Sequence, residues 1–173
     1  MAILGNNNHW ARGHIDPWWG KLHQSLEYIN EPFNDAAALA EWYQVGYSSA
    51  TNFTGDMYDM RNSEPSWIAP FQSHFGFEHF SWSVYRMNPG TVLPEHQDTY
   101  SRFRQIHSLD PAQPVGRAIV FLEDWQSGHY LEMNGKPVVD WQAGDWVCWE
   151  GNFPHAAANV GKTPRYTLQI TGI

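Results

Sequence analysis

The chain of 173 residues is 42% hydrophobic and 16% aromatic. It can therefore bury one real core but is too short for two, so we expect a single domain over residues 1–173. The formal net charge of −8, with ten basic residues and no run of them, argues against nucleic acid and anionic membrane as partners, because both attract clustered Lys and Arg.

The amino end carries no visible signal peptide. Residues 1–4 are apolar, but Gly5 and three asparagines follow at once, and no basic residue precedes them. No apolar stretch approaches the roughly 18 residues that span a bilayer. The single cysteine, Cys148, cannot form an internal disulfide. A reducing cytoplasm is therefore the expected setting.

Residues 1–75 are predicted to form a helical and irregular N-terminal support. Short helices are expected at residues 22–29 and 35–43, with Asn34 as the N-cap of the second. Gly, Pro, Ser and Asn are frequent in residues 47–74, and such residues favour turns. This stretch is therefore predicted to be loop.

Residues 76–173 are predicted to form a β-rich core. Apolar and polar residues alternate between positions 80 and 85, and Asn134-Gly135 is a strong hairpin signal. Strands are expected at residues 80–85, 118–122, 129–133, 137–141, 146–149, 156–160 and 166–170. So many short strands with turns between them favour a mainly β fold, closed or in two sheets, with N-terminal helices packed outside.

A histidine followed two residues later by a carboxylate occurs twice, at His14-Ile15-Asp16 and at His96-Gln97-Asp98. In a chain with nine His and eighteen acidic residues, about one such match arises by chance. The first match lies in an irregular segment. The second follows a strand and a tight turn, and a spacing of two along an extended backbone directs both side chains the same way. We therefore favour His96 and Asp98 as metal ligands.

His155 is the third candidate ligand. It follows Pro154 and precedes three alanines, whose small side chains leave room beside a metal. A histidine that simply sits at a barrel rim is the alternative. Two histidines and one carboxylate on one face of a metal leave the opposite face open, as in non-haem Fe(II) enzymes that admit a cosubstrate and O2.

Arg165 is a candidate clamp for the far carboxylate of a 2-oxo diacid, because its planar fork matches a carboxylate bidentately. If residues 160–164 form a hairpin loop, His155 pairs near Gln169. His155, Arg165 and Thr167 then point into the same cavity, because pairs across a hairpin share a face. A loop of four residues would instead turn Arg165 outward, so an exposed Arg-Thr-Gln face remains the alternative.

Several motifs together resemble the 2-oxoglutarate/Fe(II)-dependent oxygenase superfamily, particularly its prolyl-hydroxylase-like and aspartyl/asparaginyl β-hydroxylase-like branches. They are Pro89-Gly90, His96-x-Asp98, the strand at 118–122, Gly144-Asp145, Pro154-His155 and Arg165-x-Thr167-Leu168. The resemblance covers residues 78–173 and implies a double-stranded β-helix (jelly-roll) core. It also implies Fe(II) held by His96, Asp98 and His155, and 2-oxoglutarate bound through Arg165 and Thr167.

Two further residues match positions from which relatives contact the cosubstrate, Tyr85 and Arg104. A tyrosine of the barrel wall is an equal alternative for Tyr85. For Arg104 the spacing is Arg-x-x-His where aspartyl hydroxylases have Arg-x-His, so an acidic substrate or a surface carboxylate is its alternative partner.

The resemblance implies a hydroxylase that acts on a peptide, a protein side chain or a small metabolite, consumes O2 and releases succinate and CO2. The presence of Asp98 points to hydroxylation, because related halogenases lack this carboxylate. The alternatives are a cupin-like protein that binds a small ligand without catalysis and a metalloenzyme that does not use 2-oxoglutarate. Arg165 discriminates between these classes, because a diacid cosubstrate requires a cation deep in the cavity.

Overall fold

The computed structural model describes residues 10–48 and 53–173; residues 1–4, considered above as a possible signal segment, lie outside this part. The helical elements are a 3-10 turn at Leu22–Ser25 (η1) and helices at Ala36–Gln44 (α1), Ala69–Phe75 (α2) and Ser101–Ile106 (α3). The strands are Trp10–His14 (β1), Ile29–Pro32 (β2), Thr54–Asp59 (β3), Phe80–Met87 (β4), Val92–His96 (β5), Gly116–Phe121 (β6), His129–Met133 (β7), Lys136–Val138 (β8), Asp145–Glu150 (β9), His155–Asn159 (β10) and Arg165–Gly172 (β11).

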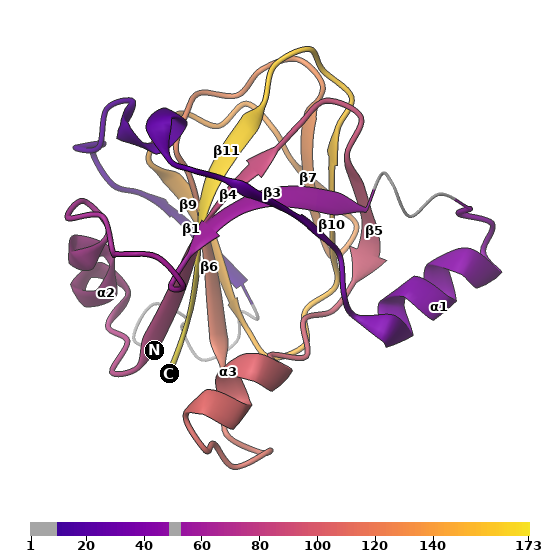
Figure 1. Ribbon diagram of the computed structural model, residues 1–173, viewed down its shortest axis with the longest axis horizontal. Helices are drawn as coiled ribbons and strands as arrows, with labels where there is room; N and C mark the ends of the chain where they lie inside the picture. Colours follow the sequence, from indigo (N-terminus) through magenta and orange to yellow (C-terminus); the bar gives the residue numbers. More distant parts are fainter. Residues whose placement is uncertain (1–9, 49–52) are drawn as a thin grey trace.

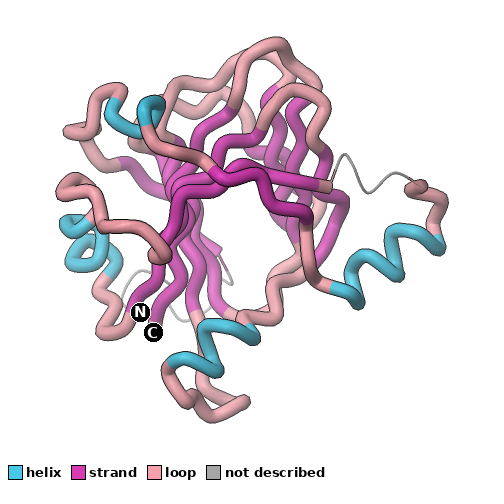
Figure 2. Tube along the Cα trace, in the orientation of Figure 1, coloured by secondary structure: helices cyan, strands magenta, loops and turns pink. Residues whose placement is uncertain are grey.

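The strands form two antiparallel sheets that face each other (Figure 1). The larger sheet has the order β1-β9-β6-β11-β4-β3-β2, and the smaller has the order β5-β10-β7-β8. In Figure 2 both layers consist of strands and the helices lie at the periphery. The protein is therefore mainly β, with the double-stranded β-helix, or jelly-roll, architecture that the sequence predicted. Within the described ranges, no helix has the length and apolar character needed to cross a membrane.

The central strands of the larger sheet are buried on both faces, and β6 is the example. Ala118 and Val120 lie on the face of the sheet turned away from the smaller sheet. There they are buried in a core cluster that includes Phe71 of α2. Ile119 and Phe121 point the other way, into the core between the two sheets. Burial of each of the larger side chains, Val120, Ile119 and Phe121, stabilises the fold by about 1.5–3 kcal/mol. This double burial explains why the segment reads as a continuous apolar run.

The N-terminal part contributes strands as well as helices, which the sequence prediction missed. The helix expected at residues 22–29 is reduced to η1 and is followed by β2. The predicted loop at 47–74 contains β3 and α2. Strand β3 pairs with β4, and β2 pairs with β3 at the sheet edge. These pairings are long-range, so local turn propensities gave no indication of them.

Helix α1 was predicted close to its observed position, but with the wrong cap. Asp35, and not Asn34, is the N-cap, because its side chain accepts hydrogen bonds from the backbone N–H groups of Ala37 and Ala38. Figure 1 places α1 beside β5, the strand that ends in His96. This arrangement brings the N-terminal part against the predicted metal ligands.

Candidate active site

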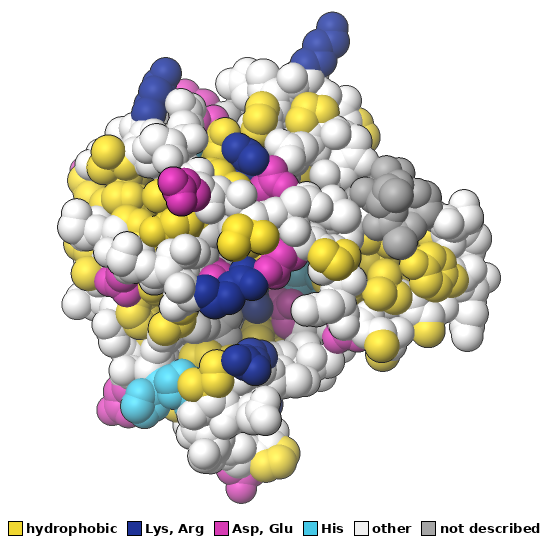
Figure 3. Space-filling view, in the orientation of Figure 1, with side chains coloured by type: hydrophobic (Ala, Val, Ile, Leu, Met, Phe, Trp, Pro, Cys, Tyr) yellow, Lys and Arg dark blue, Asp and Glu magenta, His cyan; other side chains and the backbone are white. Residues whose placement is uncertain are grey.

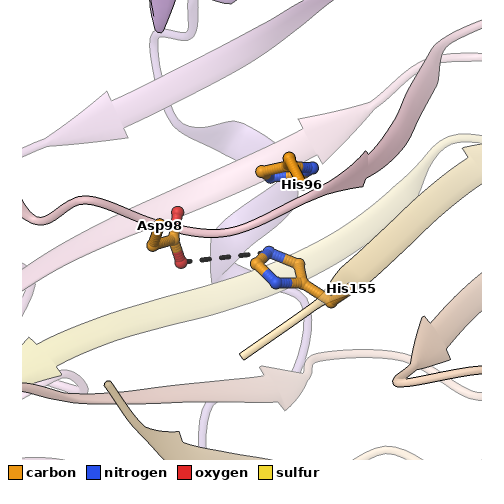
Figure 4. A group of neighbouring side chains, drawn as sticks. All are labelled: His96, Asp98 and His155. Carbon is orange, nitrogen blue, oxygen red and sulfur yellow. Dashed lines mark ion pairs between the residues drawn. The ribbon is translucent and has the colours of Figure 1, made fainter. Parts of the chain in front are cut away.

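The structure brings His96, Asp98 and His155 together. His96 ends β5 and His155 begins β10, and these two residues are partners in the antiparallel pairing of the two strands. Their ring centroids are 4.3 Å apart, and His155 Nε2 lies 3.9 Å from Asp98 Oδ2 (Figure 4). One ligand atom from each of the three residues lies within 4.8 Å of the other two. The group could therefore hold a single metal ion.

Backbone carbonyls orient both imidazoles for metal binding. His96 Nδ1 lies 2.8 Å from the Pro94 carbonyl oxygen, and His155 Nδ1 lies 2.9 Å from that of Phe153. A carbonyl oxygen only accepts, so each Nδ1 carries the proton and each Nε2 presents a lone pair. Locking the tautomer in this way is typical of metal-binding histidines.

The electrostatics of the three side chains also suit a cation. Burial lowers the pKa of His155 to about 4, so its ring is neutral near pH 7. Burial on its own raises the pKa of Asp98, but the charges of Arg117, His155 and His96 outweigh it and hold that pKa below its ordinary value. Asp98 Oδ2 is buried and has no hydrogen-bond partner among the described residues. Neither His155 nor Asp98 needs to lose a proton before binding a metal at neutral pH.

Aromatic side chains from the N-terminal part support His96. The rings of Phe33 and Trp42 meet its imidazole edge-on, with centroids 5.2 and 5.6 Å away. The Trp42 indole N–H donates to the carbonyl oxygen of Glu95, 2.9 Å away. Helix α1 and the residues before it therefore hold the end of β5 and the imidazole of His96 in place.

Arg165 is buried, with 5% of its surface exposed, and lines the same cavity as the three candidate ligands. One end of its guanidinium donates to the carbonyl oxygen of Tyr130. Its Nε has no partner within residues 10–48 and 53–173, and neither has the buried hydroxyl of Thr167. Thr167 lies two residues further along β11 but is not among the cavity-lining residues of the described chain. Burial lowers the pKa of Arg165 to about 10, so the group is still a cation near pH 7. A buried cation with an unused donor is suited to an anionic ligand.

The predicted hairpin between the strands at residues 156–160 and 166–170 was wrong. Strand β10 pairs with β5 and β7, whereas β11 pairs with β4 and β6. Residues 160–164 therefore cross from one sheet to the other. His155, Arg165 and Gln169 nevertheless line one cavity, because the inner faces of the two sheets oppose each other.

The cavity has a volume of about 230 Å³. Residues of β2, β3 and the segment before α1 form one of its walls, including Glu31, Phe33, Gly55 and Met57. Figure 3 shows this face hollowed near its centre, with charged side chains of both signs around the hollow. No sequence motif indicated this wall, because its residues share no pattern and meet only in the fold.

Tyr85 lines the cavity, as its predicted role requires. Its hydroxyl donates to the carbonyl oxygen of Thr54, 3.0 Å away. Burial raises the pKa of Tyr85 to about 12, although the charge of Arg165 opposes the rise. The phenol is therefore protonated, and both interpretations of this residue, wall and cosubstrate contact, fit its position.

Two residues considered from the sequence lie elsewhere. Arg104, on α3, donates to the carbonyl oxygens of Asp110 and Gln113 at 3.1 and 2.9 Å. It is not among the cavity-lining residues of the described chain, so its placement does not support the predicted contact with a cosubstrate. His14 Nδ1 lies 2.8 Å from Asp145 Oδ1, at the pairing of β1 with β9. This is a contact between strands outside the cavity.

Arg117 is a cavity residue that the sequence analysis overlooked. It stands at the second position of β6, and its Nη1 donates to Gln169 Oε1, 2.9 Å away. Its position two residues before Ile119, which points inward, could have indicated its direction, because alternate residues of a strand share a face.

No protein-family model matches the sequence, and no curated protein does. Among solved structures, the chain is similar to a prolyl-4-hydroxylase from Pseudomonas putida, with a TM-score of 0.60 and 18% identity over 96% of this chain and 92% of the other. A predicted oxalate decarboxylase from Thermotoga maritima gives a TM-score of 0.44 and 14% identity over 85% and 94% of the two chains. A cupin protein from Bacteroides fragilis gives 0.39 and 14% over 58% and 71%. At such identities, the hydroxylase likeness shows a shared jelly-roll fold.

Proposed function

We propose that the protein is an Fe(II)- and 2-oxoglutarate-dependent oxygenase that hydroxylates a C–H bond. In this reaction the substrate, 2-oxoglutarate and O2 give the hydroxylated substrate, succinate and CO2. The observation that carries the proposal is the buried Arg165, which lines the same cavity as His96, Asp98 and His155. Burying the charged guanidinium of Arg165 costs folding free energy. A jelly-roll protein that binds only a metal ion has no need of this additional cation.

The three candidate ligands fit a ferrous ion. Two imidazole nitrogens and one carboxylate oxygen form the ligand set that non-haem Fe(II) oxygenases use, and they leave coordination positions open. His96 and His155 would bind through Nε2, since each Nδ1 is engaged by a carbonyl. The bound iron would supply the activation of O2. The protein supplies the orientation of the ligands, which Phe33 and Trp42 support for His96.

The residues beside this group fit 2-oxoglutarate. A five-carbon diacid has one end that can approach the metal and a far carboxylate that needs a cationic partner. Arg165 would bind that carboxylate, helped by the hydroxyl of Thr167, because both carry unused buried hydrogen-bonding atoms within the described residues. Tyr85 stands beside Arg165 and adds a protonated phenol to the wall.

The cavity wall keeps water away from the reacting atoms. Ile119, Leu131 and Trp149 contribute apolar surface from three strands of the two sheets, and Met57 closes the side formed by the N-terminal part. Excluding water strengthens the ion pairs inside the cavity and limits side reactions. The similarity to the Pseudomonas putida prolyl-4-hydroxylase supports this class of reaction. The substrate is proposed to be a small molecule or a peptide.

The test is 2-oxoglutarate turnover and binding. We expect the purified protein with Fe(II) and ascorbate to release succinate from 2-oxoglutarate. We also expect 2-oxoglutarate to raise the melting temperature of the Mn(II)-loaded protein. Arg165→Gln should abolish both effects, whereas Arg12→Gln, at an exposed arginine of β1, should preserve them. If Arg165→Gln kept both effects, Arg165 would not be the residue that binds 2-oxoglutarate, and the observation that carries the proposal would fail. Absence of both effects in the wild type would instead favour a cupin-type protein that does not use 2-oxoglutarate.

A further inference from the structure

We infer that Arg117 forms a second anion-binding position in the cavity, which recognises a carboxylate of the substrate close to the carbon that is oxidised. This inference rests on the proposed function and narrows its substrate class. Arg117 and Arg165 are the two basic residues among those that line the cavity in the described chain. They belong to neighbouring strands, β6 and β11.

The guanidinium of Arg117 is held in place but largely unused. Its Nη1 donates to Gln169 Oε1 at 2.9 Å, and its Cζ lies 5.5 Å from the centroid of the Tyr100 ring. Its Nε is buried and finds no partner in the described part of the chain. The side chain is 18% exposed. An arginine cannot lose its charge at neutral pH, so these donors stay available for an acceptor.

Asp98 forms an ion pair with this guanidinium but accepts no hydrogen bond from it. Arg117 Nη2 lies 3.6 Å from Asp98 Oδ2, which is beyond hydrogen-bond distance. In the proposed enzyme, Asp98 is also committed to the metal. Glu31, the other acidic residue among the described lining residues, forms an ion pair with Arg61, which also pairs with Asp59. A carboxylate from outside the protein is therefore the partner that the site lacks.

The charges of the loaded site lead to the same conclusion. With the divalent metal and 2-oxoglutarate bound, the two charges of the diacid and that of Asp98 balance those of the metal and Arg165. The charge of Arg117 is then left over, in a site largely shielded from water. One additional negative charge balances that of Arg117, and a carboxylate matches the planar fork.

The position of Arg117 limits where this carboxylate lies in the substrate. Arg117 reaches to 3.6 Å from a residue of the candidate metal group, and the cavity is small, at about 230 Å³. A carboxylate bound there would stand beside the metal. The oxidised carbon must therefore carry the carboxylate or lie a few bonds from it, as in a short carboxylic acid, an amino acid or an acidic side chain.

The test uses Mn(II)-loaded protein saturated with 2-oxoglutarate. Calorimetry would measure the binding of acetate, propionate, N-acetylglycine and N-acetylaspartate, each compared with its uncharged amide. Charge-assisted hydrogen bonds contribute about 1.5–3 kcal/mol, so we expect at least one carboxylate to bind roughly tenfold or more tightly than its amide. Binding of acetate or propionate would indicate a small acid, whereas binding confined to the N-acetyl compounds would indicate an amino acid or peptide.

Matched variants show whether Arg117 recognises a substrate carboxylate or only stabilises the charge of Asp98. Arg117→Gln should lose the preference for the carboxylate while its affinities for Mn(II) and 2-oxoglutarate stay within about threefold of the wild type. Gln169→Glu should also lose the preference, because it gives Arg117 an internal carboxylate. Arg12→Gln should behave as the wild type. A wild type that binds 2-oxoglutarate but shows no carboxylate preference overturns this inference alone. So does a preference that survives Arg117→Gln, or a loss of Mn(II) affinity in that variant with the preference intact. Failure of the wild type to bind 2-oxoglutarate rejects the proposed function as well.

Discussion

Replacing Arg165 with methionine should stabilise the protein and, at the same time, weaken its affinity for 2-oxoglutarate. Burial lowers the pKa of Arg165 from 12.5 to about 10. Keeping the group charged at pH 7, below both values, therefore costs on the order of 3 kcal/mol. Methionine removes this cost and fills most of the space. It also removes the hydrogen bond to the Tyr130 carbonyl, a loss of about 1 kcal/mol.

The net expectation is a gain of about 1–2 kcal/mol in the free energy of unfolding of the ligand-free protein. For a chain of this size, that gain corresponds to a rise of roughly 2–8 °C in melting temperature. The affinity for 2-oxoglutarate should fall by at least about 2 kcal/mol, or some 30-fold, because truncating one partner of a buried charge pair leaves the other unpaired. Calorimetric melting and titration of the Mn(II)-loaded protein measure the two effects.

The opposite signs of the two effects make this prediction specific. Arg12→Met, at an exposed position of β1, should change neither quantity and serves as the control. A destabilised Arg165→Met protein that binds 2-oxoglutarate as tightly as the wild type would refute the reasoning. In that case Arg165 would be a structural cation whose bond to Tyr130 matters more than its buried charge.

Other changes test the metal group and the cavity wall. Asp98→Ala should weaken Mn(II) binding at least about a hundredfold, because it removes a ligand and not merely a supporting contact; unchanged affinity in an equilibrium dialysis would exclude Asp98 as a ligand. Burial lowers the pKa of His155 to about 4 from an ordinary 6.5. Between these values the unfolded chain takes up a proton and the folded protein does not, so stability is complete above about pH 6.5 and falls as the pH drops toward 4. Urea unfolding of the metal-free protein should show this loss, up to about 3 kcal/mol, and His155→Gln should flatten it; an equally steep profile in that variant would contradict the assignment. Gly55→Ala should destabilise the protein by about 1–3 kcal/mol, because the new methyl would lie 1.7 Å from the Tyr85 ring; an unchanged melting temperature would show that the ring moves aside freely.

Much of the jelly-roll core was predictable from local patterns. Period-two alternation, the continuous apolar run at 118–122 and the turn Asn134-Gly135 each report on neighbouring residues, and all correspond to observed strands or turns. The candidate ligands His96 and Asp98 were recognisable for the same reason. Their spacing of two is a local property of the sequence, although β5 ends at His96 and Asp98 lies two residues beyond the strand.

The tertiary structure decided what depends on contacts between distant segments. Strands β2 and β3 gain their partners by long-range pairing, so their turn-rich sequences misled the prediction. The hairpin expected between β10 and β11 does not exist, because the two strands pair with other strands in different sheets. Arg117 meets Asp98 across the interior, with no motif to announce it. The residue types that can bind a metal and a diacid were thus visible in the sequence. Their convergence in one small, buried cavity follows from the closure of two sheets, since facing surfaces bring together residues that are far apart along the chain.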